Sequence, residues 1–311
     1  MDSSALASVS AIASQMISLF LMMFAGFLAA KTQLISPEIR RKLSALVLNI
    51  ACPCIILSSV LESGGQPEDM LSALCAALVF YAVMIALGFL LVKLFRTPKD
   101  EQHLDQLMLV LTNLAFMGIP IIKGLYGAMG VAMLSMFILI FNFLVFTYGV
   151  FLVSGGRGMK PRQLLNTGVF SSLLALFFGL TGFHLPGPVE SALSSLGATT
   201  TPLSMMIIGA SVAHSDIRAA FSKPRIYRVT ALRLLLMPAL LLAIMKLLPF
   251  SPLLSGIAVL VAAMPIAGNC GMLSDVYLPD DPTASHAIVV TTLLSGLTLP
   301  LVVLAMGLFG L

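Results

Sequence analysis

Two apolar stretches of the chain contain the residues that could bind a small anion, Leu111–Gly127 and Ala262–Tyr277. Each holds residue types that a plain membrane-spanning helix avoids, because proline removes a backbone hydrogen bond and glycine adds backbone freedom. Where a helix unwinds in an apolar environment, the free N–H groups of the next half-helix carry a partial positive charge that attracts a carboxylate. The residues expected to interrupt the helices are Asn113, Gly118 and Pro120 in the first stretch and Pro265 in the second.

The side-chain amides of Asn113 and Asn269 could orient such an anion by donating hydrogen bonds to it. For Asn113, the alternative is a hydrogen bond between helices that only helps packing. The chain repeats the feature at Asn269, close to Pro265, which favours binding. The candidate substrate-binding residues at the two interruptions are Thr112, Asn113 and Ala115, then Pro265, Gly268 and Asn269; Cys52 is added from an earlier apolar segment.

Two more polar residues lie inside apolar segments. Asn142, in FNFLVFTYG, is a candidate for the same site, but its polar neighbours do not share one helix face, so packing and pocket lining both stay open. Arg233 lies well inside its segment, and either extends its charge to the headgroups or attracts an anion into an inward-facing vestibule. Asp275 could pair with Arg233, bind a coupling ion, or lie at the interface beside Asp280 and Asp281.

Neither metal handling nor catalysis is expected. Cys52-Pro53-Cys54 could pass soft metal ions, but the chain lacks the nucleotide-binding glycine loop and large soluble insert that metal pumps need. Ser211 and His214 share a helix face, but a nucleophile also needs an oxyanion hole in a watered cavity. Because that pair lies at the end of its apolar segment, we predict that the protein is not an enzyme.

The composition predicts an all-α polytopic membrane protein. Hydrophobic residues make up 59% of the 311 residues, charged residues make up 10%, and the mean hydropathy is +1.05. A soluble domain of this length could not bury so much apolar surface. The net charge of +4 comes from basic residues in short clusters between apolar runs, so no nucleic-acid partner is expected.

About ten apolar segments, each of the length that spans a bilayer, follow one another with short links. They cover residues 10–30, 43–61, 70–92, 105–123, 128–153, 164–181, 187–213, 227–248, 253–277 and 285–309. The longest polar link, Ser154–Gln163, falls at the midpoint, which predicts two five-helix units at residues 1–154 and 163–311.

Lys and Arg residues gather in alternate links, which predicts the orientation of the chain. Basic clusters follow the first, third, fifth and seventh segments, and the intervening links have almost none. Links rich in Lys and Arg face the cytoplasm, so both termini are expected on the periplasmic or extracellular side. With five helices per half, the second half enters the membrane in the opposite sense, as in an inverted repeat. Interrupted segments at corresponding places of two such halves are typical of a secondary transporter's binding site.

Four stretches resemble the auxin efflux carrier family, which includes bacterial malonate and malate permease-like members. They are TNLAFMGIPIIKGLYG at 112–127, TTPLSMMIIGASVA at 200–213, RLLLMPALLL at 233–242 and MPIAGNCGMLSDVYLPDD at 264–281. The resemblance implies ten helices in two inverted repeats, in a fold similar to that of sodium/bile-acid symporters. It implies that segments 4 and 9 cross at Thr112-Asn113 and Pro265. It also implies a scaffold of segments 1, 2, 6 and 7 that supports a homodimer, and a transport unit of segments 3–5 and 8–10.

The predicted function is secondary transport of small organic anions, mainly carboxylates, by alternating access across a bacterial inner membrane. No ATP-handling motif is present, so no cofactor is expected, and a coupling ion, Na⁺ or H⁺, stays open. One alternative is a sodium-coupled symporter of larger amphipathic acids. An alternative of another class is a membrane sensor or an intramembrane enzyme.

Overall fold

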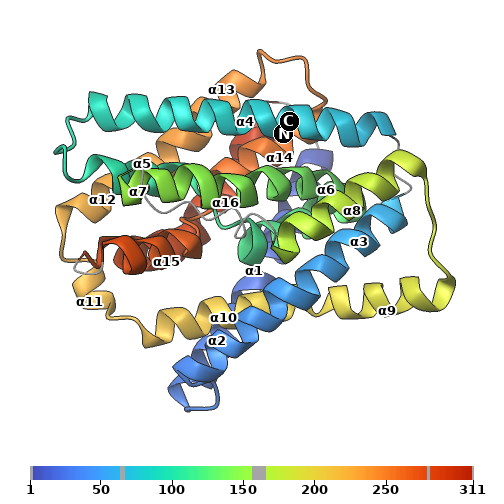
Figure 1. Ribbon diagram of the computed structural model, residues 1–311, viewed down its shortest axis with the longest axis horizontal. Coiled ribbons are helices and arrows are strands. Elements are labelled where there is room, and N and C mark those ends of the chain that lie inside the picture. Colours follow the sequence, from blue (N-terminus) through green and yellow to red (C-terminus); the bar gives the residue numbers. More distant parts are fainter. Residues whose placement is uncertain (1–2, 64–66, 156–165, 279–280, 310–311) are drawn as a thin grey trace.

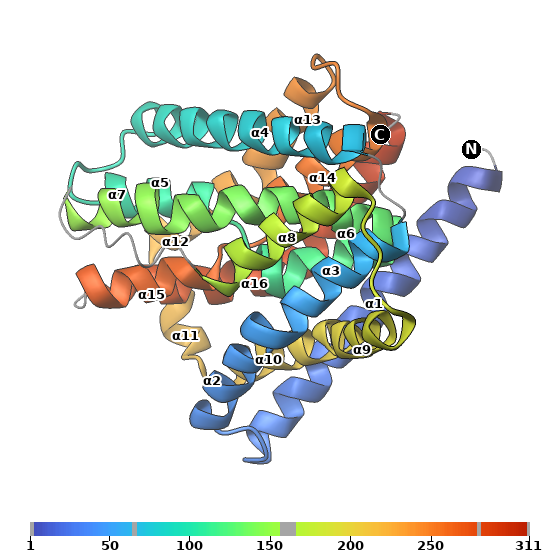
Figure 2. The same cartoon turned by 45° about the vertical axis from the view of Figure 1, so that its right-hand side comes forward.

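The computed structural model describes residues 3–63, 67–155, 166–278 and 281–309, and nearly all of them are helical (Figures 1 and 2). In the first half, the α-helices (α) and π-helices (η) are α1 (Ser3–Lys31), α2 (Pro37–Leu46), η1 (Val47–Ala51), α3 (Cys52–Ser63), α4 (Pro67–Leu94), α5 (Gln102–Val110), η2 (Leu114–Gly118), α6 (Ile119–Leu144), η3 (Val145–Gly149) and α7 (Val150–Ser154). In the second half they are α8 (Thr167–Thr181), α9 (Gly187–Ala198), α10 (Thr200–His214), α11 (Ile217–Ala220), α12 (Pro224–Ala231), η5 (Leu232–Leu236), α13 (Met237–Met245), α14 (Pro252–Ala263), α15 (Gly268–Tyr277) and α16 (Thr283–Leu308).

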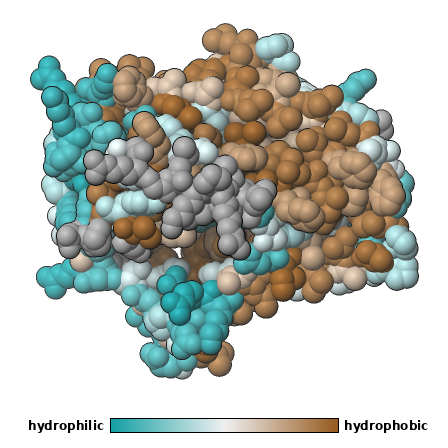
Figure 3. Space-filling model, in the orientation of Figure 1, coloured by the Kyte–Doolittle hydropathy of each residue, from teal (hydrophilic) through white to brown (hydrophobic). Residues whose placement is uncertain are grey.

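Within the described chain, six helical stretches are long and apolar enough to cross a membrane, as expected for a polytopic membrane protein. They are Pro37–Ser63, Pro67–Leu94, Leu114–Ser154, Gly187–His214, Pro224–Met245 and Thr283–Leu308. Shorter apolar helices cover Ile17–Lys31, Thr167–Thr181 and Pro252–Ala263. Hydrophobic residues cover much of the visible surface, and hydrophilic residues gather at its left end and lower edge (Figure 3).

The stretch Leu114–Ser154 is not one straight helix. Gly127 has a φ of 63° and a ψ of −152°, so two helices meet there at a kink. A positive φ is readily available only to glycine, because a side chain would collide with the backbone. The kink therefore lies between the fourth and fifth predicted segments, residues 105–123 and 128–153.

Three of the π-helices have a common cause, a proline two residues after their end. η1 precedes Pro53, η2 precedes Pro120, and η5 precedes Pro238. In each case the residue just before the proline donates its N–H to the carbonyl five residues back, as Ile119 does to Leu114. A proline ring collides with the carbonyl four residues before it, so the helix widens instead of ending. Pro120 is therefore accommodated within a helix.

The closest helix approach joins α1 to α10, and glycines make it possible. A Cβ atom on Gly26 would overlap the backbone of Met206, and one on Gly209 would overlap the carbonyl of Met23. Gly197 lets α9 approach the backbone of α3 in the same way, and α3 also packs against α8. Small residues at such contacts allow backbones to pack closely in a membrane, where the hydrophobic effect between helices is absent.

An ion-pair cluster joins the start of α5 to α12 and to the link before α16. The Asp105 carboxylate is almost fully buried and accepts hydrogen bonds from Arg225 Nε and Arg228 Nη2, each at 2.8 Å. Arg225 Nη1 also lies 3.2 Å from Asp281, and Arg228 Nη2 lies 3.1 Å from Glu101. Because buried charges are stable only when paired, this cluster fixes the polar end of α5.

Gly209→Ala should lower the free energy of unfolding by about 1–3 kcal/mol, the usual cost of an extra group in a packed core. Thermal unfolding of the detergent-purified protein measures the effect. The matched control is Gly307→Ala in α16, where an added Cβ meets nothing within 4 Å. That control should be neutral or slightly stabilising, because alanine favours a helix. Equal melting temperatures for the two variants would contradict the close approach of α1 and α10.

Candidate substrate site at the helix crossover

Two interrupted helical stretches cross inside the protein. Helix α5 ends at Val110 and η2 begins at Leu114, while α14 ends at Ala263 and α15 begins at Gly268. The residues between them form an antiparallel bridge from Thr112 to Ile266. We call this region, residues 111–113 and 264–267, the crossover. It lies at the predicted positions Thr112-Asn113 and Pro265.

The crossover satisfies its own backbone. The Asn113 N–H donates to the Pro265 carbonyl at 3.0 Å, and the Ala267 N–H donates to the Leu111 carbonyl at 3.1 Å. The Ile266 N–H donates to the hydroxyl of Thr291 in α16 at 3.3 Å. Pro265 needs no donor partner, because proline has no N–H. Unpaired backbone groups are costly away from water, so each interruption depends on the other.

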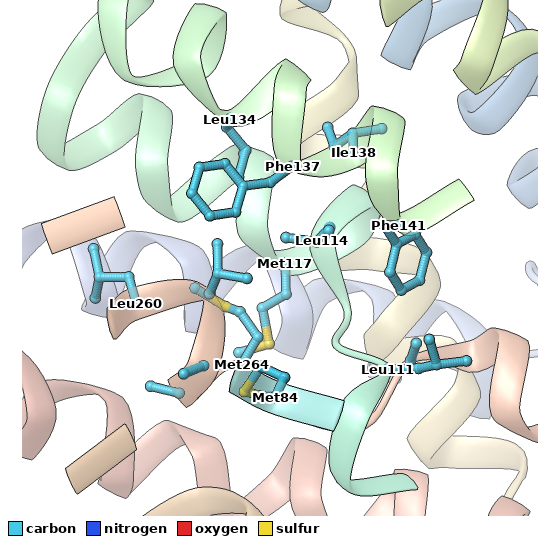
Figure 4. Close-up of a cluster of buried hydrophobic side chains, with 14 of the residues drawn as sticks. Met84, Leu111, Leu114, Met117, Leu134, Phe137, Ile138, Phe141, Leu260 and Met264 are labelled. Atoms are coloured by element: carbon cyan, nitrogen blue, oxygen red, sulfur yellow. The ribbon is translucent and has the colours of Figure 1, made fainter. Parts of the chain in front are cut away.

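Apolar side chains enclose the crossover. Figure 4 shows Leu111 and Met264 at the two interruptions, in a cluster with Met84, Met117 and Leu260. All five are buried. The backbone hydrogen bonds of the crossover are therefore made in a dry environment, where they are strongest.

The sequence places helix breaks at Gly118 and Pro120 as well, and the structure differs there. Both lie in the continuous helix formed by η2 and α6, in which the π turn accommodates the proline. The interruption before that helix ends at Asn113, whose side-chain oxygen accepts the Phe116 N–H at 3.3 Å and caps η2.

A cavity of about 250 Å³ lies beside the crossover. The starts of two half-helices contribute to it, through Leu114 and Ala115 of η2 and through Asn269 of α15. Helices η1, α3, α6, η3 and α8 provide the rest of its wall. The polar lining residues are Asn49, Cys52, Asn142, Asn166, Thr167, Ser171 and Asn269. The apolar ones are Leu48, Pro53, Ile56, Leu114, Ala115, Ile119, Ile138, Phe141, Phe146, Gly168 and Met272.

Of the residues predicted from sequence, Cys52, Ala115, Asn142 and Asn269 line this cavity. Gly268 precedes Asn269 and is exposed, with open space where a Cβ would lie. Three others, Thr112, Asn113 and Pro265, build the crossover instead and do not line the cavity.

Arg233 is placed differently from both sequence interpretations. Its side chain is completely buried in η5 and does not line the cavity, so it neither reaches the headgroups nor faces a vestibule. Its Nη2 lies 3.5 Å from the carbonyl of Val261. The Asp275 side chain lies outside the described part of the chain.

Sequence reasoning missed Asn49 and Asn166. Asn49 is an isolated amide in an apolar run, the same signal that singled out Asn113. Asn166 caps α8, accepting the Val169 N–H at 3.0 Å, and an asparagine before an apolar run is a helix-start signal. A third feature could not be found from sequence: a Cβ on Gly168 would lie 2.7 Å from the Asn142 amide, so this glycine makes room for Asn142.

The cavity has a neutral lining that can donate hydrogen bonds. Among the described lining residues, none is charged. Asn49 and Asn142 each donate to a carbonyl of their own helix at 2.8 Å. Within the described chain, the Asn269 side-chain amide makes no hydrogen bond, and Asn269 lies in the first turn of α15. Asn269 is therefore the lining side chain best placed to bind a solute.

A second hollow, of about 320 Å³, lies between the ends of α3 and α8 and the start of α4. It is lined by residues such as Val60, Pro67, Phe178 and His184. Val60 and Phe178 lie near the C-terminal ends of α3 and α8, whereas the cavity beside the crossover is lined by the first turns of these helices. No residue of the crossover or of the interrupted helices contributes to it, so we do not assign it to the site.

A profile of the membrane transport protein family matches residues 11–160 and 157–303. The chain belongs to this family, that of the auxin efflux carriers. This transporter is 24% identical over 293 residues to an uncharacterized transporter of Methanothermobacter thermautotrophicus, covering 92% of this chain and 95% of the relative. It is also 24% identical to an uncharacterized transporter of Methanocaldococcus jannaschii, covering 90% and 94%. The protein is therefore a multi-pass membrane transporter.

Asn269→Ala should raise the KM of this transporter for an anionic solute roughly tenfold or more, because a hydrogen bond to a charged group contributes about 1.5–3 kcal/mol. Its melting temperature should not change, since the amide makes no bond in the protein. The matched control is Asn113→Ala, which loses the cap of η2 and should lose about 1 kcal/mol of stability. Uptake kinetics and thermal unfolding on both variants decide the roles. A normal KM for Asn269→Ala would remove Asn269 from the site.

Proposed function

We propose that this transporter is a secondary transporter of small organic anions, mono- or dicarboxylates, which works by alternating access. The observation that supports the proposal most is the cavity at the starts of two half-helices. The N-terminus of a helix carries about half a positive charge and free N–H groups, so two of them favour a carboxylate without a basic side chain. The Asn269 amide adds a hydrogen-bond donor beside them.

The size and lining of the cavity favour a small substrate. Its volume is below the roughly 300–1,000 Å³ of pockets that take drug-sized ligands. Phe141, Phe146 and Met272 provide an apolar wall for a short hydrocarbon part. Because the lining side chains are neutral, only the two helix starts offset the negative charge of a substrate. They can offset one or two charges better than three. These features favour the small carboxylates over the larger amphipathic acids of the alternative proposal.

For the architecture, we propose ten membrane-spanning segments in two inverted repeats, residues 1–154 and 163–311. Each predicted apolar segment contains helix, and the two interrupted ones, segments 4 and 9, hold corresponding places in the two halves. In the proposed scaffold, α1 packs on α10, and α3 packs on α8 and α9. The cavity lies between α3 and α8 on one side and η2, α6 and α15 on the other. Movement between these two groups would expose the cavity to one side of the membrane at a time.

Uptake into liposomes tests the proposed function. The purified protein is reconstituted and offered radiolabelled mono- and dicarboxylates, with and without sodium and pH gradients. We expect saturable uptake of at least one small carboxylate, and little uptake by Asn269→Asp, which sets a second carboxylate in a poorly screened site. Liposomes without protein are the control.

Two outcomes of the uptake experiment would favour other functions. Uptake of a large amphipathic acid, driven only by a sodium gradient, would favour a sodium-coupled symporter. Transport of neutral or cationic solutes alone would contradict the anion proposal.

The proposed orientation in a bacterial inner membrane has both termini outside. In a Cys75→Ser background, which removes the exposed native cysteine, Lys99→Cys and Lys223→Cys should react with an impermeant maleimide only from the cytoplasmic side. His184→Cys and Leu247→Cys, both at exposed positions, should react only from outside. Labelling of intact cells and of inverted vesicles separates the two sides. Reaction of Lys99→Cys and Lys223→Cys from opposite sides would contradict the five-plus-five arrangement.

A further inference from the structure

Arg233 is a buried cation that the proposed transport mechanism does not use. Its side chain is completely buried in η5, and its one hydrogen bond joins Nη2 to the Val261 carbonyl at 3.5 Å. Within the described chain, Nε and Nη1 have no partner. Arg233 also makes no ion pair with any described residue. A guanidinium cannot lose its proton in a protein, so its charge must be compensated by something else.

The side chains near Arg233 do not provide that compensation. Tyr81 of α4 and Cys270 of α15 are its neighbours, and Thr112 of the crossover lies beside Tyr81. The Cys270 thiol donates to the Leu107 carbonyl at 3.7 Å. The hydroxyls of Tyr81 and Thr112 are buried, without a hydrogen-bond partner in the described chain. These are donors and neutral groups, and none is an anion.

The ends of two half-helices provide the missing negative charge. Val261 lies in the last turn of α14, and Leu107 lies in the last turn of α5. The last four carbonyls of a helix have no partner within that helix, and each helix end carries about half a negative charge. The Val261 carbonyl accepts from Arg233 directly, and the Leu107 carbonyl accepts from Cys270, which neighbours Arg233. Residues 107–110 and 260–263 are fully buried or nearly so, which keeps these helix ends away from bulk water.

The crossover therefore separates the two polarities of its interrupted helices. Their positive starts, at Leu114 and Asn269, contribute to the cavity. The end of α14 binds Arg233, and the end of α5 binds Cys270, a neighbour of Arg233. In transporters with interrupted helices, such negative ends and unwound carbonyls are the groups that coordinate a coupling Na⁺ or proton. In this chain, an arginine occupies that environment.

We propose that Arg233 is a built-in cation that takes the place of a coupling sodium ion at the crossover, so that this transporter works without sodium. The role of Arg233 as a built-in cation is argued from the geometry. The inference that transport needs no sodium rests on the proposed transport function. Arg233 is a positioning residue in this account. It donates to the end of α14 and does not touch the substrate.

Thermal unfolding of the purified full-length protein tests the proposal without a substrate. Melting is measured in sodium, potassium and choline chloride at equal ionic strength. The wild-type protein should melt at one temperature in all three salts. Arg233→Met should melt several degrees lower in choline, and sodium should restore part of that loss, because a small cation can then occupy the vacated carbonyls. Arg233→Lys should keep most of the stability and show no response to sodium, because a positive charge remains.

The control is Lys42→Met, which removes an exposed basic residue paired with Glu38 and should show no sodium response. Sodium-dependent melting of the wild-type protein would overturn the proposal. So would an Arg233→Met variant that is as stable as the wild type, or one whose loss of stability sodium does not reverse. If Arg233→Met does not fold, the wild-type salt series and Arg233→Lys still decide, since a sodium response in either contradicts a built-in cation.

Uptake measurements distinguish this proposal from the proposed function. Where a carboxylate is taken up, its rate should be the same with and without a sodium gradient, and a sodium requirement would overturn the inference. If no carboxylate is transported at all, the proposed function fails, and the melting series still tests the role of Arg233.

Discussion

The structure depends on one constraint, that interrupted backbone buried away from water must find hydrogen-bond partners. Neither interruption could exist alone, because the groups freed at residues 111–113 and 264–267 would be left unpaired in a dry core. The two solve the problem together: Asn113 donates to Pro265, and Ala267 donates to Leu111. Because the two interruptions pair with each other, their segments must cross. The positions of the cavity and of Arg233 follow from that crossing.

Because the two segments cross, the positive and negative ends of their half-helices lie inside the protein. An uninterrupted helix brings its charged ends to the membrane surfaces, where water and headgroups screen them. Here two positive starts and two negative ends lie in the interior, where electrostatic interactions are strong. The positive starts contribute to a cavity lined by neutral amides, and Arg233 donates to a carbonyl at the end of α14. Without an opposite charge, either pair of ends would repel within the core.

The positions of the interruptions could be predicted from sequence, because asparagine and proline are unfavourable inside an apolar helix unless they cap or interrupt it. Their finer geometry could not be, since Pro120 follows a π turn that keeps the helix continuous, and no periodicity distinguishes a widened helix from a broken one. Asn49 and Asn166 carry local signals, an isolated amide and a helix start, but only packing shows that both line the cavity of Asn269. Arg233 shows the same limit. Its position inside an apolar segment fits a side chain that extends its charge to the headgroups. Only the tertiary structure shows that this side chain is buried at the end of α14.

The separation of Arg233 from the cavity also explains how a substrate anion could be released. A basic side chain facing the substrate in a poorly screened site would form a strong ion pair, and breaking it would cost several kcal/mol in each transport cycle. Neutral amides and helix starts offer weaker attraction, of about 1–3 kcal/mol for each hydrogen bond to a charged group. A transporter needs binding that is favourable enough to select its substrate and weak enough to lose it on the other side. In the proposed mechanism, Arg233 keeps its positive charge at the end of α14, away from the cavity that the solute must leave.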